Sequence, residues 1–136
     1  MIEAGVLIDK NGCPFHWHLP EGRTGGSIPD TRSLWDVIWD NRDHILGFAH
    51  SHPGGGIPAP SWTDLTTFAA IEAALGRRLY WWITSSEHFI RLEWCGPEKT
   101  DYGFRTSEHT PDWVGELRMY SDHETDGVEL ILTMGS

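Results

Sequence analysis

The sequence is poor in positive charge and in cysteine. Lysine and arginine together number 10, against 20 aspartates and glutamates, so the formal net charge is −10 over 136 residues. An acidic chain of this kind repels phosphate groups, and we therefore expect no nucleic acid partner. The two cysteines, Cys13 and Cys95, lie far apart and form no Cys-x-x-Cys pair. They are too few for a disulfide framework.

Long apolar runs and a leader-like N-terminus are also absent. No stretch approaches the roughly 18 apolar residues that a membrane-spanning helix needs. The first residues carry no basic patch and no cleavage-like site of small residues. We therefore expect a cytoplasmic protein without a membrane partner. Because 39% of the residues are hydrophobic and no linker or internal repeat interrupts the chain, we predict a single packed domain over residues 1–136.

Alternating apolar and polar residues around Asn11 and Gly12 predict an N-terminal β-hairpin. The pairs expected on its core face are Val6 with Trp17 and Ile8 with Phe15. His16 and His18 then fall on the opposite, polar face of the hairpin, where Glu3 is their neighbour.

Beyond the hairpin, capping residues and hydrophobic periodicity predict helices that alternate with strands. One helix is expected to begin at Asp30 or Thr31 and to end near His44, and another to run from Ser61 to Gly76. Strands are expected at 45–52, 79–84, 89–94 and 128–134, with a long polar loop at 96–111. This pattern indicates a mixed α/β (α+β) fold, in which helices pack on a mixed β-sheet.

The segment His50-Ser51-His52 carries the clearest chemical signal. Side chains two apart on a strand point to the same face, so the two imidazoles lie about 7 Å apart and are able to converge on one ion. Ser61 and Asp64 follow in the first turn of the next helix, where Asp64 offers a third ligand. Two histidines and one carboxylate suit a zinc ion with a fourth position left for water. We therefore expect one Zn²⁺ per chain and metal-assisted amide hydrolysis.

This run resembles the JAMM signature of the JAB/MPN metallopeptidases: an upstream glutamate, then His-Ser/Thr-His, a loop, Ser, two residues and Asp. The loop of this chain is one residue longer than that of the signature. The resemblance implies that His50, His52 and Asp64 bind zinc and that Ser61 helps to hold the oxyanion. It implies that an upstream glutamate is the general acid/base, and that the fold is a cytidine-deaminase-like mixed sheet flanked by helices.

Two glutamates precede the signature. Glu3 leads into an apolar run that looks like the strand following the family's glutamate, whereas Glu21 lies in a glycine-rich loop. A strand holds a base more rigidly than such a loop, so we favour Glu3 and keep Glu21 as the alternative. His16 and His18 form a second His-x-His without a third ligand nearby in sequence. We therefore predict a polar sheet face there, with contact to substrate left open.

The resemblance implies a zinc peptidase or isopeptidase, similar to deubiquitinases, that acts on the C-terminal tail of a ubiquitin-like or sulfur-carrier-like protein. An extended tail is expected to add to a sheet edge near the zinc, with recognition by the loops 53–60 and 96–111. The alternatives are a non-catalytic MPN-like interaction module, which the complete ligand set disfavours, and a peptidase that acts on phage tail or cell-wall peptides.

Overall fold

The structure, a computed structural model, describes residues 2–26, 28–106, 109–122 and 128–131. Its elements are β1 (Gly5–Asp9), β2 (Pro14–Leu19), α1 (Arg32–Asp40), β3 (Ile45–Ser51), α2 (Trp62–Leu75), β4 (Tyr80–Thr84), β5 (Phe89–Trp94), β6 (Tyr102–Thr106), α3 (Asp112–Asp122) and β7 (Val128–Ile131). The strands form one sheet in the order β6-β5-β4-β3-β1-β2-β7, in which β3 and β4 run parallel and the other described pairs are antiparallel. The predicted mixed sheet with packed helices is confirmed.

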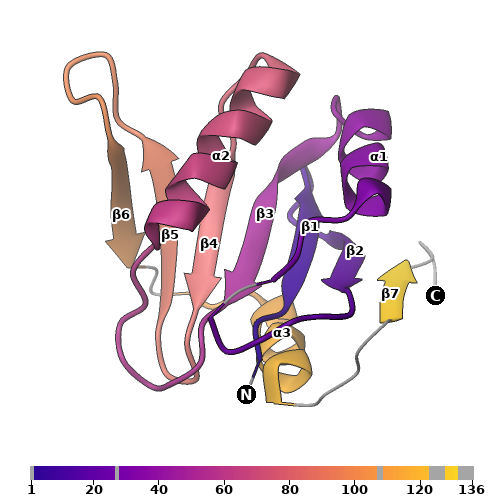
Figure 1. Cartoon of the computed structure of the whole chain (residues 1–136). Helices are drawn as coiled ribbons and strands as arrows, with labels where there is room; N and C mark the ends of the chain where they lie inside the picture. The colour runs from indigo at the N-terminus through magenta and orange to yellow at the C-terminus, as the bar shows by residue number, and fades with distance from the viewer. Residues whose placement is uncertain (1, 27, 107–108, 123–127, 132–136) are drawn as a thin grey trace.

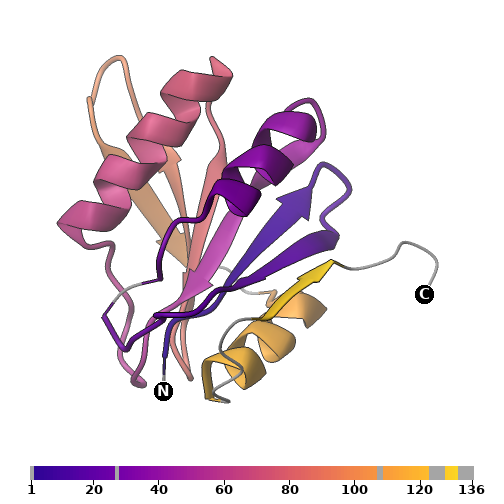
Figure 2. The ribbon, with the colours of Figure 1, turned by 45° about the vertical axis from the view of Figure 1, so that its right-hand side comes forward.

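Helices cover both faces of the sheet. Helices α1 and α2 lie over one face and α3 lies over the other (Figures 1 and 2). Leu34 of α1 and Phe68 of α2 belong to the same core cluster as Trp81, whereas Trp113 of α3 packs in a second cluster with Trp82. The adjacent tryptophans of β4 enter different cores because neighbouring residues of a strand point to opposite faces.

Both predicted helix starts are confirmed, and one predicted end is wrong. Thr31 caps α1 and Ser61 caps α2, while Gly76 ends α2 in the left-handed conformation with φ of 69°. Helix α1 ends at Asp40, four residues before His44. Asn41 explains the earlier end, because its side chain donates to the Val37 carbonyl at 2.9 Å and so competes with the next helical turn.

The N-terminal hairpin differs from the prediction at its turn. Ile8 lies opposite Pro14 instead of Phe15, because the register shifts between Leu7 and Ile8. Asp9 organises the wider turn: its Oδ1 accepts hydrogen bonds from two backbone N–H groups of the turn, at 2.9 and 3.0 Å. An Asx turn of this type lengthens the connection beyond the two residues that Asn-Gly favours.

The prediction also fails in the last third of the chain. The expected loop at 96–111 contains β6, an edge strand, and α3 follows it without having been predicted. Trp113, Val114 and Leu117 carried the helical spacing that would have predicted α3. The last strand spans Val128–Ile131, and the expected residues 132–134 lie outside the described part of the chain. Among the described residues, no helix combines the length and the apolar character needed to cross a lipid bilayer.

Candidate metal centre

The two histidines of the motif converge at the end of the central strand. His50 lies on β3 with its side chain 3% exposed, and His52 follows the strand with 20% exposed. The backbone N–H of His52 donates to the Thr84 carbonyl at 2.8 Å, which keeps the chain extended beyond β3. The rings turn toward each other, so that their Nε2 atoms lie 2.9 Å apart.

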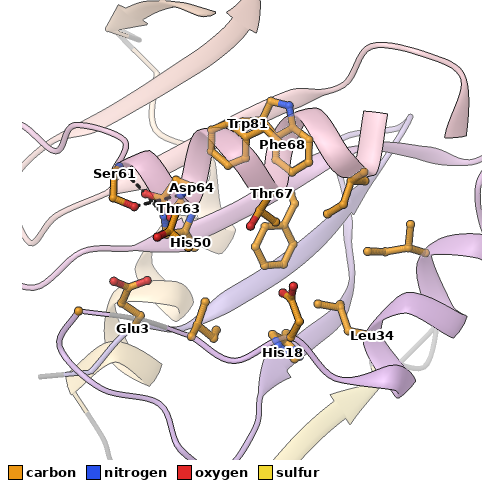
Figure 3. Close-up of a pocket in the computed structure, with 16 residues that line it drawn as sticks. Glu3, His18, Leu34, His50, Ser61, Thr63, Asp64, Thr67, Phe68 and Trp81 are labelled. Carbon is orange, nitrogen blue, oxygen red and sulfur yellow. Dashed lines mark hydrogen bonds and ion pairs between the residues drawn. The ribbon is translucent and has the colours of Figure 1, made fainter. Parts of the chain in front are cut away.

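Asp64 completes this pair from the first turn of α2 (Figure 3). It forms a capping box with Ser61: the Ser61 hydroxyl accepts from the Asp64 N–H at 3.0 Å, and Asp64 Oδ2 accepts from the Ser61 N–H at 2.9 Å. The same Oδ2 lies 3.3 Å from His50 Nε2 and 3.2 Å from His52 Nε2. The helix cap therefore aims a carboxylate oxygen at both imidazoles.

The spacing of these three donor atoms fits a metal ion. Two ligand atoms at about 2.0–2.1 Å from a tetrahedral zinc lie about 3.3–3.4 Å apart. The triangle formed by His50, His52 and Asp64 has sides of 2.9, 3.2 and 3.3 Å. Two nitrogens and one oxygen in this arrangement leave a coordination position for water.

Glu3 faces the same centre from the segment before β1. Its side chain is buried, and a carboxylate oxygen and the ring nitrogens of His50 and His52 all lie within 4.8 Å of one another. Figure 3 shows Glu3 across the cavity from Asp64 and Ser61. This group of side chains also offers a set of possible metal ligands, in which Glu3 takes the place of Asp64.

Hydrogen bonds hold Glu3 although it lies outside the strand. Its N–H donates to the Thr24 carbonyl at 2.8 Å, and its carbonyl accepts from Arg23 Nη1 at 3.1 Å. The next N–H, that of Ala4, donates to the Ser51 hydroxyl at 2.8 Å. Ser51, the residue between the two histidines, therefore ties the segment of Glu3 to the strand that carries His50.

Helix α3 supports this segment from the far end of the chain. Ile2 donates to the Ser121 carbonyl at 2.9 Å and accepts from the Ser121 hydroxyl at 2.6 Å. Arg23 Nη1 lies 3.4 Å from the Tyr120 carbonyl as well. Sequence reasoning missed Arg23, Ser51 and Ser121, because contacts between segments so far apart leave no local pattern.

The surroundings of Glu3 and Asp64 shift the pKa values of these two carboxyl groups in opposite directions. Burial raises the pKa of Glu3, although His50 and His52 counteract part of that rise. Burial also acts to raise the pKa of Asp64, but hydrogen bonds from both histidines outweigh it and hold that pKa well below its usual range. Two neighbouring carboxyl groups with such different environments suit different tasks, one exchanging protons and the other staying anionic.

The pKa of His52 is shifted by its two acidic neighbours. Burial disfavours the charged ring, but the hydrogen bond that the ring donates to Asp64 and the negative charges of Glu3 and Asp64 together raise the pKa. The same negative charges attract a cation that replaces the proton between the rings.

The alternative base, Glu21, and the second histidine pair, His16 and His18, lie apart from the triangle of donor atoms. Glu21 is exposed, and the structure does not bring it to the centre that Glu3 faces. His16 and His18 do share a sheet face, but they are 2% and 1% exposed, because this face lies under α1 and the loop before it. His18 Nε2 lies 2.6 Å from the Pro29 carbonyl of that loop. The polar sheet face that the sequence predicted is therefore buried.

Two features near the centre bear on how a substrate reaches it. The centre lies on β3, the fourth strand of seven, so the edge strands are about 14 Å away at the usual strand spacing. The addition of a substrate tail to a sheet edge near the zinc stays a prediction. Ile57 of the loop 53–60 and Trp62 at the start of α2 are 63% and 83% exposed. The β5–β6 connection lies at the opposite end of the sheet from the first turn of α2 (Figure 1).

Comparison with protein-family models identifies a match to the family described as prokaryotic homologs of the JAB domain, over residues 7–95. The match covers well over half of the chain. It includes both histidines, Ser61 and Asp64, and it begins after Glu3. Comparison with curated proteins finds no match.

Proposed function

Because the chain belongs to the prokaryotic homologues of the JAB domain, we propose that it is a zinc-dependent peptidase or isopeptidase of the JAMM type. The proposed reaction is hydrolysis of an amide bond at the C-terminal tail of a ubiquitin-like or sulfur-carrier-like protein. The observation that supports it most strongly is the triangle of His50, His52 and Asp64 donor atoms, with sides no longer than 3.3 Å, beside a second, buried carboxylate.

His50, His52 and Asp64 are the residues that would hold the metal. Bound zinc polarises a scissile carbonyl and lowers the pKa of water to about 7. Asp64 suits a ligand because its hydrogen bonds keep it anionic, and because the capping box fixes the direction of its Oδ2. A ligand oriented by the first turn of a helix needs no further ordering when the ion arrives.

Glu3 is the proposed general acid/base. It accepts the proton of the attacking water and returns a proton to the leaving amine. Its raised pKa, a consequence of burial, brings its affinity for a proton closer to the value that this exchange requires near neutral pH. The hydrogen bond that Glu3 donates to the Thr24 carbonyl and the one that it accepts from Arg23 fix the backbone from which this carboxylate extends.

Ser61 is the proposed donor to the oxyanion. Its oxygen already accepts the N–H of Asp64 at 3.0 Å, which leaves its own O–H available to donate. A donor fixed in this way stabilises negative charge that develops on the substrate oxygen. The exposed Ile57 and Trp62 beside it offer apolar contacts to a protein substrate.

The experiment compares Glu3→Gln with Glu21→Gln, a matched change in the exposed alternative. The substrates are a ubiquitin-like protein and a sulfur-carrier-like protein, each with a C-terminal peptide extension, and cleavage is followed by mass spectrometry. We expect one zinc per chain in the wild type and in both variants. Glu3→Gln should lower kcat by about 10²–10⁴, and Glu21→Gln should leave it nearly unchanged.

Two results would overturn this proposal. Protein that contains less than about a tenth of an equivalent of divalent metal, and takes up none on titration, is not a metallopeptidase. Zinc-loaded protein that binds these substrates without cleaving them is an interaction module. Equal loss of activity in Glu3→Gln and Glu21→Gln would contradict the role of Glu3 as general acid/base. It would leave the rest of the proposal standing.

A further inference from the structure

An apolar cavity extends from the candidate metal centre into the space between α1, α2 and the sheet. Its volume is about 100 Å³. Glu3, His50, Ser61 and Asp64 line one end. Its apolar walls consist of Leu34 and Ile38 from α1, Phe68 and Ile71 from α2, and Phe48 and Trp81 from the sheet. Figure 3 shows Glu3, Ser61 and Asp64 on one side of the cavity and Leu34 on the other, where His18, a buried polar residue of the lining, lies beside it.

This space is larger than ordinary packing leaves. Protein interiors contain few voids bigger than a water molecule. Beyond the apolar walls a further void of about 10 Å³ shares Ile38, Phe48, Ile71 and Trp81 with the cavity. The packing between α1, α2 and the sheet therefore leaves two separate spaces that share these four residues as walls.

The cavity is accessible from its polar end. Ser61, Thr63 and Asp30 line it and are themselves exposed, whereas its apolar lining residues are buried except for Ile28 and Phe48, which are partly buried. A polar mouth with fixed hydrogen-bonding groups and an apolar interior is the usual composition of a small-ligand site. Water gains little in the apolar part, which offers it few partners.

We propose that this cavity binds an aliphatic side chain of the substrate, on a residue that flanks the scissile amide. The inference rests on the proposed function, because the metal ligands and Glu3 at its mouth define where that amide lies. The volume of the cavity limits which side chains fit. A cavity of 150 Å³ holds benzene. A volume of about 100 Å³ therefore suits leucine, isoleucine or methionine and is too small for tryptophan. Glycine at this position leaves the cavity empty.

The first test measures cleavage of peptide amides that differ only in the residues flanking the scissile bond. We expect kcat/KM for the best aliphatic residue to exceed that for glycine by about 10- to 100-fold, as burial of such a side chain allows. Tryptophan should be cleaved no faster than glycine. Equal rates for leucine, glycine and tryptophan at both flanking positions, with cleavage intact, would overturn the inference and leave the proposed function standing.

Thr67 and Thr66 provide matched variants on α2. Thr67 lines the cavity between its two ends (Figure 3), whereas Thr66 is exposed and does not line it. Thr67→Phe should abolish the preference for leucine while cleavage of the glycine substrate continues, and Thr66→Phe should retain the preference. The smaller changes Thr67→Leu and Thr66→Leu repeat the comparison if phenylalanine prevents folding. If the substitutions of Thr67 and Thr66 both abolish the preference for leucine, the cavity does not select the substrate residue.

A binding measurement separates the inference from the proposed function. N-acetyl-leucinamide and N-acetyl-glycinamide are titrated into methyl-labelled protein, and the NMR signals of Ile38 and Ile71 are followed. Saturable shifts with the leucine probe alone, lost in Thr67→Phe, support the cavity even if no peptide is cleaved, in which case only the peptidase proposal fails. Identical responses to both probes would overturn the inference.

Discussion

At the scale of single residues, Asp64 joins a structural task to a chemical one. The same Oδ2 accepts the Ser61 N–H and lies within 3.3 Å of both histidine Nε2 atoms. A helix cap is therefore part of the candidate metal centre. Substitution of Ser61 or Asp64 therefore affects both the free energy of unfolding and the chemistry of the centre. Only separate measurements distinguish the two effects.

Replacement of Ser61 by alanine tests this separation. Ser61→Ala should cost about 1 kcal/mol of unfolding free energy through the lost cap. It should lower kcat by about 10²–10³ if the hydroxyl donates to the oxyanion. Urea unfolding gives the first quantity, and turnover of zinc-loaded protein gives the second. A variant that loses stability but retains its turnover per zinc would show that Ser61 serves only as a cap.

Sequence spacing was sufficient to bring His50 and His52 to one face, since the two-residue period of a strand requires it. It overestimated their separation, because the period sets Cα positions whereas the rings turn inward to Nε2 atoms 2.9 Å apart. Which of Glu3 and Glu21 lies at the candidate metal centre is decided by long-range contacts. A hydrogen bond from Arg23 and one to the Ser51 hydroxyl place the segment of Glu3, and no local pattern encodes them.

At the scale of secondary structure, β3 and β4 approach each other more closely than most side chains allow. A Cβ on Gly47 of β3 would lie 1.9 Å from the Tyr80 carbonyl of β4. Gly47 is therefore required by the parallel pairing that sets the position of His50.

Gly47→Ala should destabilise the protein by more than about 2 kcal/mol and weaken zinc binding, because β3 must move away from its neighbour. Gly56→Ala, in the loop before α2, is the matched control, since a Cβ there meets nothing within 4 Å. Thermal unfolding and zinc titration measure both effects. Equal stability of the two variants would contradict the close approach.

Strand β6 illustrates why the last third of the fold escaped prediction. Its attachment depends on Glu72, a buried carboxylate of α2 that accepts hydrogen bonds from the Tyr102 hydroxyl, Arg78 Nη1 and Trp81 Nε1. Tyr102 belongs to a segment whose polar composition is typical of a loop. The strand pairs with β5 along its whole length, and this pairing, together with the long-range polar contact at Tyr102, overrides local propensity.

The pH dependence of stability tests this contact. Burial and the Glu72 carboxylate raise the pKa of the Tyr102 phenol in the folded state, although Arg78 opposes the shift. The folded protein therefore holds this proton more tightly than the unfolded chain, whose phenol titrates near pH 10. The stabilisation is complete below about pH 10 and is lost as the pH rises further. The stability advantage of wild type over Tyr102→Phe should thus shrink above pH 10 in urea unfolding; a constant difference from pH 8 to pH 11 would contradict it.

At the scale of the whole molecule, the sheet separates two hydrophobic cores, and the candidate metal centre lies at the end of one of them. Leu117 of α3 and Trp17 of β2 are fully buried in one core, and Ile83 and Leu92 are fully buried in the other, under α2 and α1. The alternation of helices and strands up to β5 was sufficient to predict a mixed architecture, because these elements carry apolar residues at the expected spacing, whereas β6 and α3 were not predicted. The support that α3 gives to the segment before β1 depends on the assembled fold.

Removal of the metal therefore leaves the fold intact. Neither core uses His50, His52 or Asp64 as a principal packing group, so chelated protein should keep its far-ultraviolet circular dichroism and unfold cooperatively. Zinc at about 100 times its dissociation constant adds about 2.7 kcal/mol, which should raise Tm by about 10 °C for a domain of this size. His50→Ala should abolish this rise, and Glu3→Gln should retain most of it. Collapse of the ordered structure on chelation would show instead that the metal organises the fold.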